Sequence, residues 1–376
     1  MHRAFLALLP TIVACGTPFG PGGAGPTSGQ DSGQDSGHDS DGGAGTDSGT
    51  TADGGTDQPG DSLRGFIGSP CATDADCDYD GGTCLTDGFP EGTCSAPCDQ
   101  YCDDQDGHPV TFCADGSDLP AAAAALGDGA CLSRCDFGLF PTTDGCRDGY
   151  GCVVVSRANE PETETYACLP GRDSELSQCH RDLAARGVAF EPTVVTPDSP
   201  DDHPELTCTV EDAVYLHGPM LGVDLRYYDG SETERVLGTC TLGLALADSI
   251  EDVAAEGVDT LYHYGTYNCR VISGTDDLSR HGYGDAIDIY GFGFSDGRFW
   301  TLVDDWEHDT SDPQGDAGQW LYDTAYAWYD ARIWSIILTP NYNSAHDDHF
   351  HVDLTPGSDY IGFRGLPWLG PNTTGE

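Results

Sequence analysis

The chain has 376 residues, of which 64 are acidic and 15 are basic, so its formal net charge at pH 7 is −49. A chain this negative repels the phosphate backbone of nucleic acids and the surface of anionic lipids, which excludes nucleic acid as an expected partner. The length is sufficient for two modest domains with tails.

The N-terminus has the pattern of a bacterial lipoprotein signal. Residues 1–3 include one arginine, residues 4–14 are mostly apolar, and Cys15 follows them. This run is too short to span a bilayer, which favours a secretory signal. The residues around Cys15 resemble the bacterial lipobox, in which the cysteine is acylated; an ordinary signal peptide with a chance cysteine is the alternative. The resemblance implies a signal peptide at residues 1–15, a lipid anchor in the membrane and a location at the cell envelope. Gly16 favours the outer membrane, facing either the periplasm or the surface.

Residues 16–66 are predicted to form a disordered tether. They consist mainly of Gly, Ser, Thr, Asp and Pro, with hardly an aliphatic side chain. Such a segment cannot bury enough apolar surface to offset the entropy lost on ordering. Calcium binding by the repeated Asp residues is the alternative, but the fixed ligand spacing of a calcium loop is missing.

Cysteines indicate a disulfide-rich region at residues 67–170. The chain has 17 cysteines, and 16 remain when Cys15 is set aside, an even number that predicts disulfides in an exported protein. Twelve of them lie in this region, where apolar residues are sparse, so we expect one or two small cross-linked modules. Residues 71–113 and 131–168 are two loosely similar blocks. No CxxC pair is present, which argues against a zinc ribbon. A spacer or a wall-binding module is the expected role.

Residues 173–370 are predicted to form a globular α+β domain with an antiparallel sheet. In this domain, the residue pattern predicts helices at residues 174–186, 240–256 and 316–332. In the preceding region, the alanine-rich composition of residues 121–126 predicts a shorter helix. Apolar or alternating runs predict strands at residues 260–264, 286–292, 298–303, 334–339 and 349–354. Sequence order suggests the disulfides Cys179–Cys208 and Cys240–Cys269.

Two groups of polar residues in this domain have the character of metal ligands. His281 and Asp288 are seven residues apart with two glycines between them. A turn at these glycines would fold His281 back over the strand that carries Asp288. In the second group, His349, His351 and Asp353 share one face of a predicted strand. A histidine cluster on the surface without a metal is the alternative.

The two groups together predict a zinc site. A catalytic zinc ion needs three protein ligands and one open position for a water molecule, which loses its proton near pH 7. We expect His281, Asp288 and His351 to be the three ligands.

Further polar residues are candidates for the chemistry. Asp348, three residues before His351, is the first candidate for the proton acceptor, and His349 competes with it. His346 would form a third polar wall of the site. If a Cys240–Cys269 disulfide holds its backbone, Arg270 would bind a substrate carboxylate or an oxyanion; a surface ion pair is the alternative.

The same residues resemble a known signature. The pattern SxHxxGxAxD of the D-alanyl-D-alanine carboxypeptidases and the penicillin-insensitive murein endopeptidases is matched by Ser279, His281, Gly284, Ala286 and Asp288. The resemblance implies a compact α+β fold shared with lysostaphin and hedgehog domains, with zinc held by His281, Asp288 and His351. The carboxypeptidase branch has an acid at the place of Asp348, whereas the endopeptidase branch has His at the places of His346 and His349.

A wider pattern is similar to the bacterial extensin-like C-terminal domain. It covers about residues 175–365 and includes residues 265–270, 279–281 and 340–354. One departure is Arg280 beside the first ligand, where the family often has Glu. We expect this positive charge to affect which peptide ends are accepted.

The expected function is that of a zinc metallopeptidase acting on peptidoglycan peptides, as a carboxypeptidase or an endopeptidase. A non-catalytic envelope or cell-wall binding lipoprotein that keeps the fold and the metal is the first alternative. A structural or adhesive surface lipoprotein, with the Cys-rich region as its working part, is the second.

Overall fold

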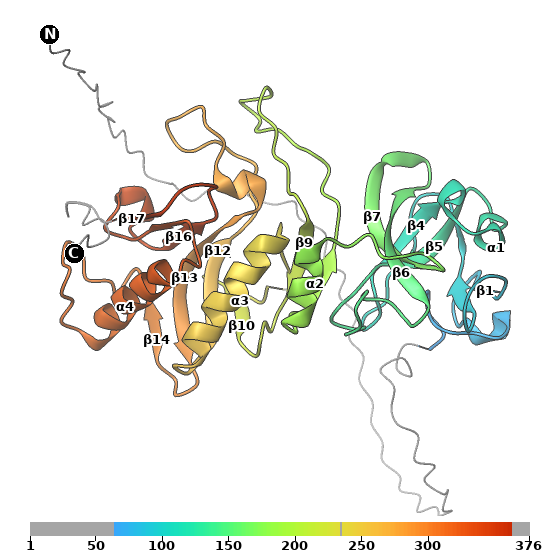
Figure 1. Ribbon diagram of the computed structural model, residues 1–376, viewed down its shortest axis with the longest axis horizontal. Coiled ribbons are helices and arrows are strands. Elements are labelled where there is room, and N and C mark those ends of the chain that lie inside the picture. Colours follow the sequence, from blue (N-terminus) through green and yellow to red (C-terminus); the bar gives the residue numbers. More distant parts are fainter. Residues whose placement is uncertain (1–63, 234, 363–376) are drawn as a thin grey trace, which may run out of the picture. The chain divides into compact units, whose positions relative to one another are not determined.

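The computed structural model describes residues 64–233 and 235–362 (Figure 1). The predicted signal sequence with Cys15 and almost all of the predicted tether lie outside these residues. No helix in the described part of the chain is long and apolar enough to cross a membrane.

The disulfide-rich region is built from short antiparallel strands. A two-stranded sheet pairs β1 (Thr83–Leu85) with β2 (Thr93–Ser95). A five-stranded sheet has the order β3 (Pro97–Cys98), β5 (Gly129–Ser133), β4 (Thr111–Asp115), β6 (Tyr150–Arg157) and β7 (Glu160–Pro170). The expected helix is present as the single turn α1 (Ala121–Ala124). One small apolar cluster, which includes Phe112, Val153 and Leu169, packs on this sheet.

Disulfides join all 16 cysteines of the described chain in a repeating pattern. In each successive group of four cysteines, the first pairs with the third and the second with the fourth. The pairs are Cys71–Cys84, Cys77–Cys94, Cys98–Cys113, Cys102–Cys131, Cys135–Cys152, Cys146–Cys168, Cys179–Cys240 and Cys208–Cys269. The Cys102–Cys131 disulfide joins the two loosely similar blocks, which favours one module over two.

The two pairs suggested from sequence order, Cys179–Cys208 and Cys240–Cys269, are also wrong. Cys179 lies in α2 (Gln178–Ala185) and Cys240 begins α3 (Cys240–Ala254), and these two helices pack against each other. Their Cα atoms are 6.0 Å apart, within the range that a disulfide can bridge. Packing between helices thus decides the pairing, and order along the chain does not.

The C-terminal region contains two sheets. The larger has the order β10 (Asp224–Tyr227), β12 (Val258–Gly265), β13 (Ala286–Phe294), β16 (Phe350–Asp353), β15 (Ile336–Leu338) and β17 (Tyr360–Gly362), and β14 (Phe299–Thr301) also pairs with β13. The smaller has the order β11 (Arg235–Thr239), β9 (Ala213–His217) and β8 (Phe190–Pro192).

The larger sheet departs from the expected antiparallel arrangement at both edges. The pairs β10·β12 and β15·β17 are parallel, whereas the pairs between them are antiparallel. Parallel neighbours require a connection that crosses over, and α3 lies in the connection from β10 to β12. The fold is therefore α+β with a mixed sheet.

Two helices cover one face of the larger sheet. Leu246 and Ile250 of α3 recur at helical spacing and are fully buried, as is Trp328 of α4 (Asp316–Asp330). They belong to the same apolar cluster as Ile287 and Ile289 of β13. Figure 1 shows both helices in front of the strands. Removing such side chains from water is the main stabilising term, at about 1.5–3 kcal/mol each.

Buried contacts join the disulfide-rich region to the C-terminal region. The rings of Phe137 and Phe190 stack with centroids 4.3 Å apart. Beside them, Arg134 forms a buried ion pair of 3.5 Å with Glu191.

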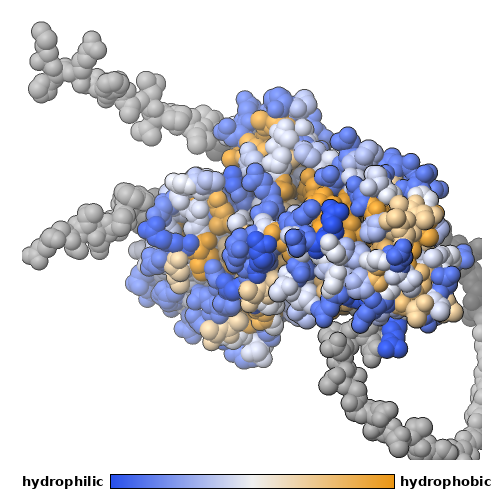
Figure 2. Space-filling model, turned by 45° about the vertical axis from the view of Figure 1, so that its right-hand side comes forward, coloured by the Kyte–Doolittle hydropathy of each residue, from blue (hydrophilic) through white to orange (hydrophobic). Residues whose placement is uncertain are grey.

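On the face shown in Figure 2, hydrophilic residues surround separate hydrophobic patches.

Candidate metal centre

His281 is held on a short 3-10 turn, Arg280–Tyr283. The Ser279 hydroxyl at its start accepts a hydrogen bond from the His281 backbone N–H. Gly284 ends the turn in the left-handed conformation, with φ of 66°, where a Cβ atom would lie 2.8 Å from Val210. The two signature residues therefore shape the backbone that presents His281.

The Cys208–Cys269 disulfide lies directly against this turn. A Cβ atom placed on Gly282 would be 3.1 Å from the Sγ atom of Cys208. Cys269 is next to Asn268, whose backbone N–H donates to the carbonyl of His281. The cross-link and the glycine therefore fix the turn from both sides.

Asp288 and His351 lie opposite each other on neighbouring strands. They are register partners between β13 and β16. Ile287 and Ile289 flank Asp288 and are fully buried under the helices. Because successive side chains of a strand alternate, Asp288 points to the open face, as the sequence predicted.

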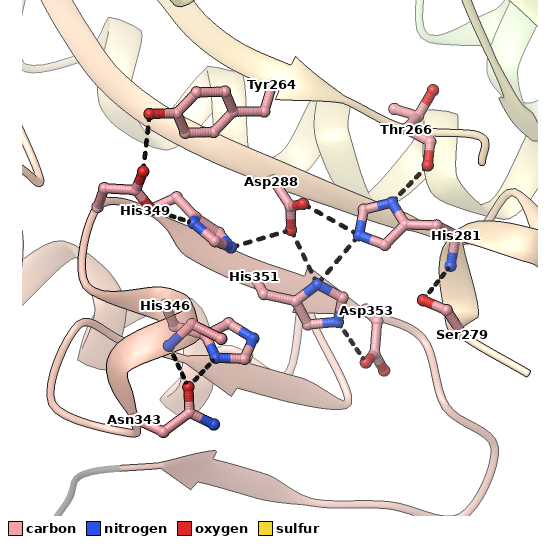
Figure 3. A network of polar contacts seen from close by, with 12 residues as sticks. Tyr264, Thr266, Ser279, His281, Asp288, Asn343, His346, His349, His351 and Asp353 are labelled. Atoms are coloured by element: carbon pink, nitrogen blue, oxygen red, sulfur yellow. Dashed lines mark hydrogen bonds and ion pairs between the residues drawn. The ribbon is translucent and has the colours of Figure 1, made fainter. Parts of the chain in front are cut away.

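The three predicted ligands converge on one point (Figure 3). The Nε2 atom of His281 is 3.2 Å from the carboxylate of Asp288 and 3.2 Å from Nδ1 of His351. The third distance, from Nδ1 of His351 to Asp288, is 2.9 Å. A tetrahedral zinc ion with bonds of about 2.0–2.1 Å holds its ligand atoms about 3.3 Å apart. His281 contacts one oxygen of Asp288 and His351 the other, so the distances do not define a tetrahedron, but the three side chains are close enough to share one zinc ion.

Each histidine of the cluster has a hydrogen-bond partner behind it. The Nδ1 atom of His281 donates to the backbone carbonyl of Thr266. The Nε2 atom of His351 is 3.0 Å from the carboxylate of Asp353. Partners of this kind fix the tautomer and the ring orientation of metal-binding histidines. One nitrogen of each ring is thereby left for the cluster.

Charges within the cluster shift the pKa values of its groups. Burial acts to raise the pKa of Asp288, but hydrogen bonds from His281 and His351 outweigh it and hold this pKa well below its ordinary value. Burial acts to lower the pKa of His351, but hydrogen bonds to Asp288 and Asp353 raise it to about 9. The site thus favours a positive charge between two carboxylates, which is the electrostatic requirement for a cation.

His349 and Asp348 form a pair beside the ligands. The Nε2 atom of His349 is 3.5 Å from the carboxylate of Asp288, and its Nδ1 atom donates to Asp348 over 2.7 Å. The second oxygen of Asp348 accepts from the Tyr264 hydroxyl over 3.0 Å. Hydrogen bonding to His349 lowers the pKa of Asp348. Asp348 therefore lies behind His349 and does not itself face the ligands.

His346 lies beside His349 and His351. Its ring centroid is 5.2 Å from that of His349 and 5.8 Å from that of His351. The Asn343 side chain is 2.8 Å from its Nδ1 atom. Burial and the two neighbouring imidazoles lower the pKa of His346 to about 4, so the ring is uncharged at pH 7.

The two arginines singled out in the sequence do not join the cluster. The exposed side chain of Arg270 makes no hydrogen bond or ion pair with the three ligands. The condition for its role is also wrong, since Cys269 pairs with Cys208. Arg280 forms an ion pair with Asp285 and lies over the ring of Tyr283. Its guanidinium group therefore makes no direct contact with the three ligands, although its charge interacts with Asp353, the carboxylate beside His351.

Three supporting residues, Tyr264, Thr266 and Asp353, contact the cluster or its neighbours through hydrogen bonds. The sequence placed Asp353 on one face with His349 and His351, whereas Tyr264 and Thr266 had no role in that prediction. Thr266 acts through its backbone carbonyl, so its side chain gave no signal.

The cluster differs from other groups of possible ligands in the described chain. The remaining groups of three are cysteines, and all of these form disulfides. His281, Asp288 and His351 remain as the group with uncommitted ligand atoms.

Residues 177–361 match the family model of the extensin-like protein C-terminus, just under half of the chain. This confirms the resemblance to the extensin-like domain that the sequence indicated. No curated protein and no solved structure matches the chain. The comparisons thus give no support to the finer likeness to D-alanyl-D-alanine carboxypeptidases, which stays a prediction.

Proposed function

We propose that the extensin-like region, residues 177–361, is a zinc-dependent peptidase that acts on peptidoglycan peptides at the cell envelope. One observation carries the proposal: one ligand atom from each of His281, Asp288 and His351 lies within 4.8 Å of the other two, so the three residues can share a zinc ion. A hydrolase also needs a proton acceptor beside the metal, and His349 is in that place.

Zinc fits the donor set of this site. Two imidazole nitrogens and one carboxylate leave a fourth position for a water molecule or a substrate carbonyl. A bound zinc ion supplies Lewis acidity, which polarises a carbonyl group and makes a water molecule acidic near neutral pH. His281, Asp288 and His351 would hold it, and Thr266 and Asp353 would orient the two rings.

His349 would act as the proton acceptor. Its Nδ1–H donates to Asp348, which leaves Nε2 unprotonated and directed at the cluster. This atom can take a proton from an attacking water molecule and pass it to the leaving amine. Asp348 would fix the tautomer, and the Tyr264 hydroxyl would hold Asp348 in place. Between the two candidates from the sequence, the proposal therefore assigns proton transfer to His349 and positioning to Asp348.

His346 would line the site next to His349. Because its pKa is lowered to about 4, it presents a neutral ring to the substrate at pH 7. Peptidoglycan as the substrate is supported by the resemblance of the ligand motif, and by the envelope location expected from Cys15.

The proposal is tested with purified protein and cross-linked muropeptides. We expect zinc-loaded protein to cleave them, a chelator to stop cleavage, and added zinc to restore it. His349→Ala is expected to lower kcat about 100-fold or more while zinc stays bound, since general acid–base groups contribute about 10²–10⁴-fold. His308→Ala is the matched control, because His308 is exposed and lies outside the cluster.

The alternative of a non-catalytic binding protein predicts a different result. Zinc-loaded protein would then sediment with purified cell wall and leave all muropeptides intact. That outcome would reject the peptidase proposal.

A further inference from the structure

Aromatic side chains lie on the open face of the larger sheet on both sides of the metal centre. We define a first arm, Tyr264, Tyr228, Tyr290 and Phe299, and a second arm, Tyr342 and Tyr360. The two arms come from opposite sides of the sheet. The first arm lies on or next to β10, β12, β13 and β14, and the second arm lies on or next to β15 and β17. The ligands Asp288 and His351 lie on β13 and β16, between the two arms.

The rings of the first arm form a continuous row that begins at His349. The Tyr264 centroid is 5.7 Å from that of His349. From Tyr264 the row continues to Tyr228 at 4.8 Å and to Tyr290 at 5.5 Å. Phe299 follows at 6.5 Å from Tyr290.

Strand alternation places this arm on the same face as the ligands. Tyr290 is two residues beyond Asp288 on β13, and both are partly exposed. On β12, Leu261 and His263 are buried under the helices, and Tyr264 projects to the other face.

The second arm begins at His346. The Tyr342 centroid is 5.6 Å from the His346 ring, and Tyr360 is 6.2 Å beyond Tyr342. Since His346 also adjoins His349 and His351, ring contacts connect the two arms through the centre.

Exposure of these rings indicates a binding surface. Tyr228 is 52% exposed, Phe299 49% and Tyr342 37%. Single exposed hydrophobic side chains are normal on a protein surface, whereas a connected row beside a polar cluster is typical of a ligand site. The position of the two arms on either side of the ligands supports a ligand that extends beyond the centre in both directions.

Charge around the centre disfavours a free terminal carboxylate. The chain contains no lysine, so all 15 of its basic residues are arginines. Arg280 is held by Asp285, and Arg270 does not contact the ligands. The acidic chain would repel an anionic end of a substrate, and neither arginine contacts the three ligands, which leaves the proposed metal ion alone to offset this repulsion.

We infer that the substrate is an internal segment of a longer peptide, such as the cross-link between two stem peptides, which crosses the sheet and is bound by both aromatic arms. The inference rests on the proposed peptidase function and assigns an endopeptidase type to it. Tyr228 and Tyr342 are the specificity-determining residues that it names.

Two substrates and four variants test this inference. The substrates are a cross-linked muropeptide dimer, which continues on both sides of the cross-link, and an uncross-linked pentapeptide monomer, which ends in a free carboxylate. We expect kcat/KM for the dimer to exceed that for the monomer at least tenfold. Tyr228→Ala and Tyr342→Ala should each lower kcat/KM for the dimer about fivefold to tenfold, mainly through KM, because an aromatic contact contributes on this scale. Tyr228→Phe keeps the ring and should retain activity, and Tyr101→Ala, in the disulfide-rich region, is the matched control with 67% exposure.

Binding gives a second measurement that does not depend on turnover. In the His349→Ala background, sedimentation with purified cross-linked cell wall should weaken when Tyr228→Ala or Tyr342→Ala is added, and should be unchanged by Tyr101→Ala. Faster cleavage of the monomer than of the dimer would overturn the inference and leave the peptidase function standing. The inference would also be overturned, with the peptidase function left standing, if Tyr228→Ala and Tyr342→Ala both had the KM and the wall binding of the wild type. If zinc-loaded protein cleaves neither substrate, the proposed function fails, and the inference falls with it.

Discussion

Replacement of Asp353 by Asn is the sharpest test of the metal centre. Asp353 is 3% exposed, and its two oxygens have separate partners. One accepts from the backbone N–H of Thr355 over 2.8 Å, and the other is 3.0 Å from Nε2 of His351. Asn has nearly the same shape, so the substitution changes the hydrogen bond and leaves the packing in place.

The expected effect is a reversal of the His351 tautomer. The backbone N–H of Thr355 needs an acceptor, so it holds the amide oxygen of the introduced asparagine. The amide N–H₂ group then faces Nε2 of His351. Nε2 must then accept, which puts the proton on Nδ1, the atom directed at Asp288 and His281. A protonated nitrogen cannot bind zinc. Loss of such a supporting carboxylate lowers metal affinity about 10–100-fold, which corresponds to about 1.4–2.7 kcal/mol.

A competition titration against a chromophoric chelator measures this change. Wild type, Asp353→Asn and Asp359→Asn are compared at one pH, where Asp359 is an exposed acid paired with Arg332 and serves as the charge-matched control. Thermal unfolding of the metal-free proteins shows whether the fold is intact. Zinc affinity of Asp353→Asn within twofold of wild type, with the fold intact, would refute the assignment of His351 as a ligand oriented by Asp353.

Three further predictions concern residues around the site. Asp348→Asn should lower kcat without changing zinc affinity, because Asp348 orients His349 and does not face the metal; equal losses in both quantities would contradict this. Gly284→Ala should destabilise the protein by about 2–3 kcal/mol in chemical unfolding, since it combines a left-handed φ with an overlap at Val210. Burial lowers the pKa of His263 to about 4, below the 6.5 of an unfolded chain, so its share of stability is complete above pH 6.5 and is lost as the pH falls towards 4. His263→Gln should therefore reduce the loss of stability between pH 6.5 and 4 by up to about 3 kcal/mol, and an unchanged pH profile would disprove it.

Local patterns in the sequence were enough to predict the elements that carry the site. The helix expected at residues 240–256 is present as α3, because one apolar stripe both defines it and buries it. The convergence of His281 on Asp288 followed from the glycines of the turn, and the exposed position of Asp288 followed from alternation with two isoleucines. These features depend on residues close together in the chain.

Features that depend on distant residues were not predictable in the same way. The parallel edges of the larger sheet arise from strands separated by a helix or by another strand. The position of Asp348 behind His349 depends on Tyr264, which is 84 residues away. The aromatic arms likewise form only when β10, β12 and β13 are side by side.

The pairing of the cysteines has a consequence for the order in which the chain can be oxidised. No disulfide of the described residues joins one group of four to another, so each group can close as soon as its last cysteine meets an oxidising environment. The three groups up to Cys168 would close in turn as short, self-contained units. The fourth waits for Cys269, and its cross-link to Cys208 supports the turn of His281. If the proposed metal needs this supported turn, its capture would follow the closure of the fourth group and would be the last step in forming the site.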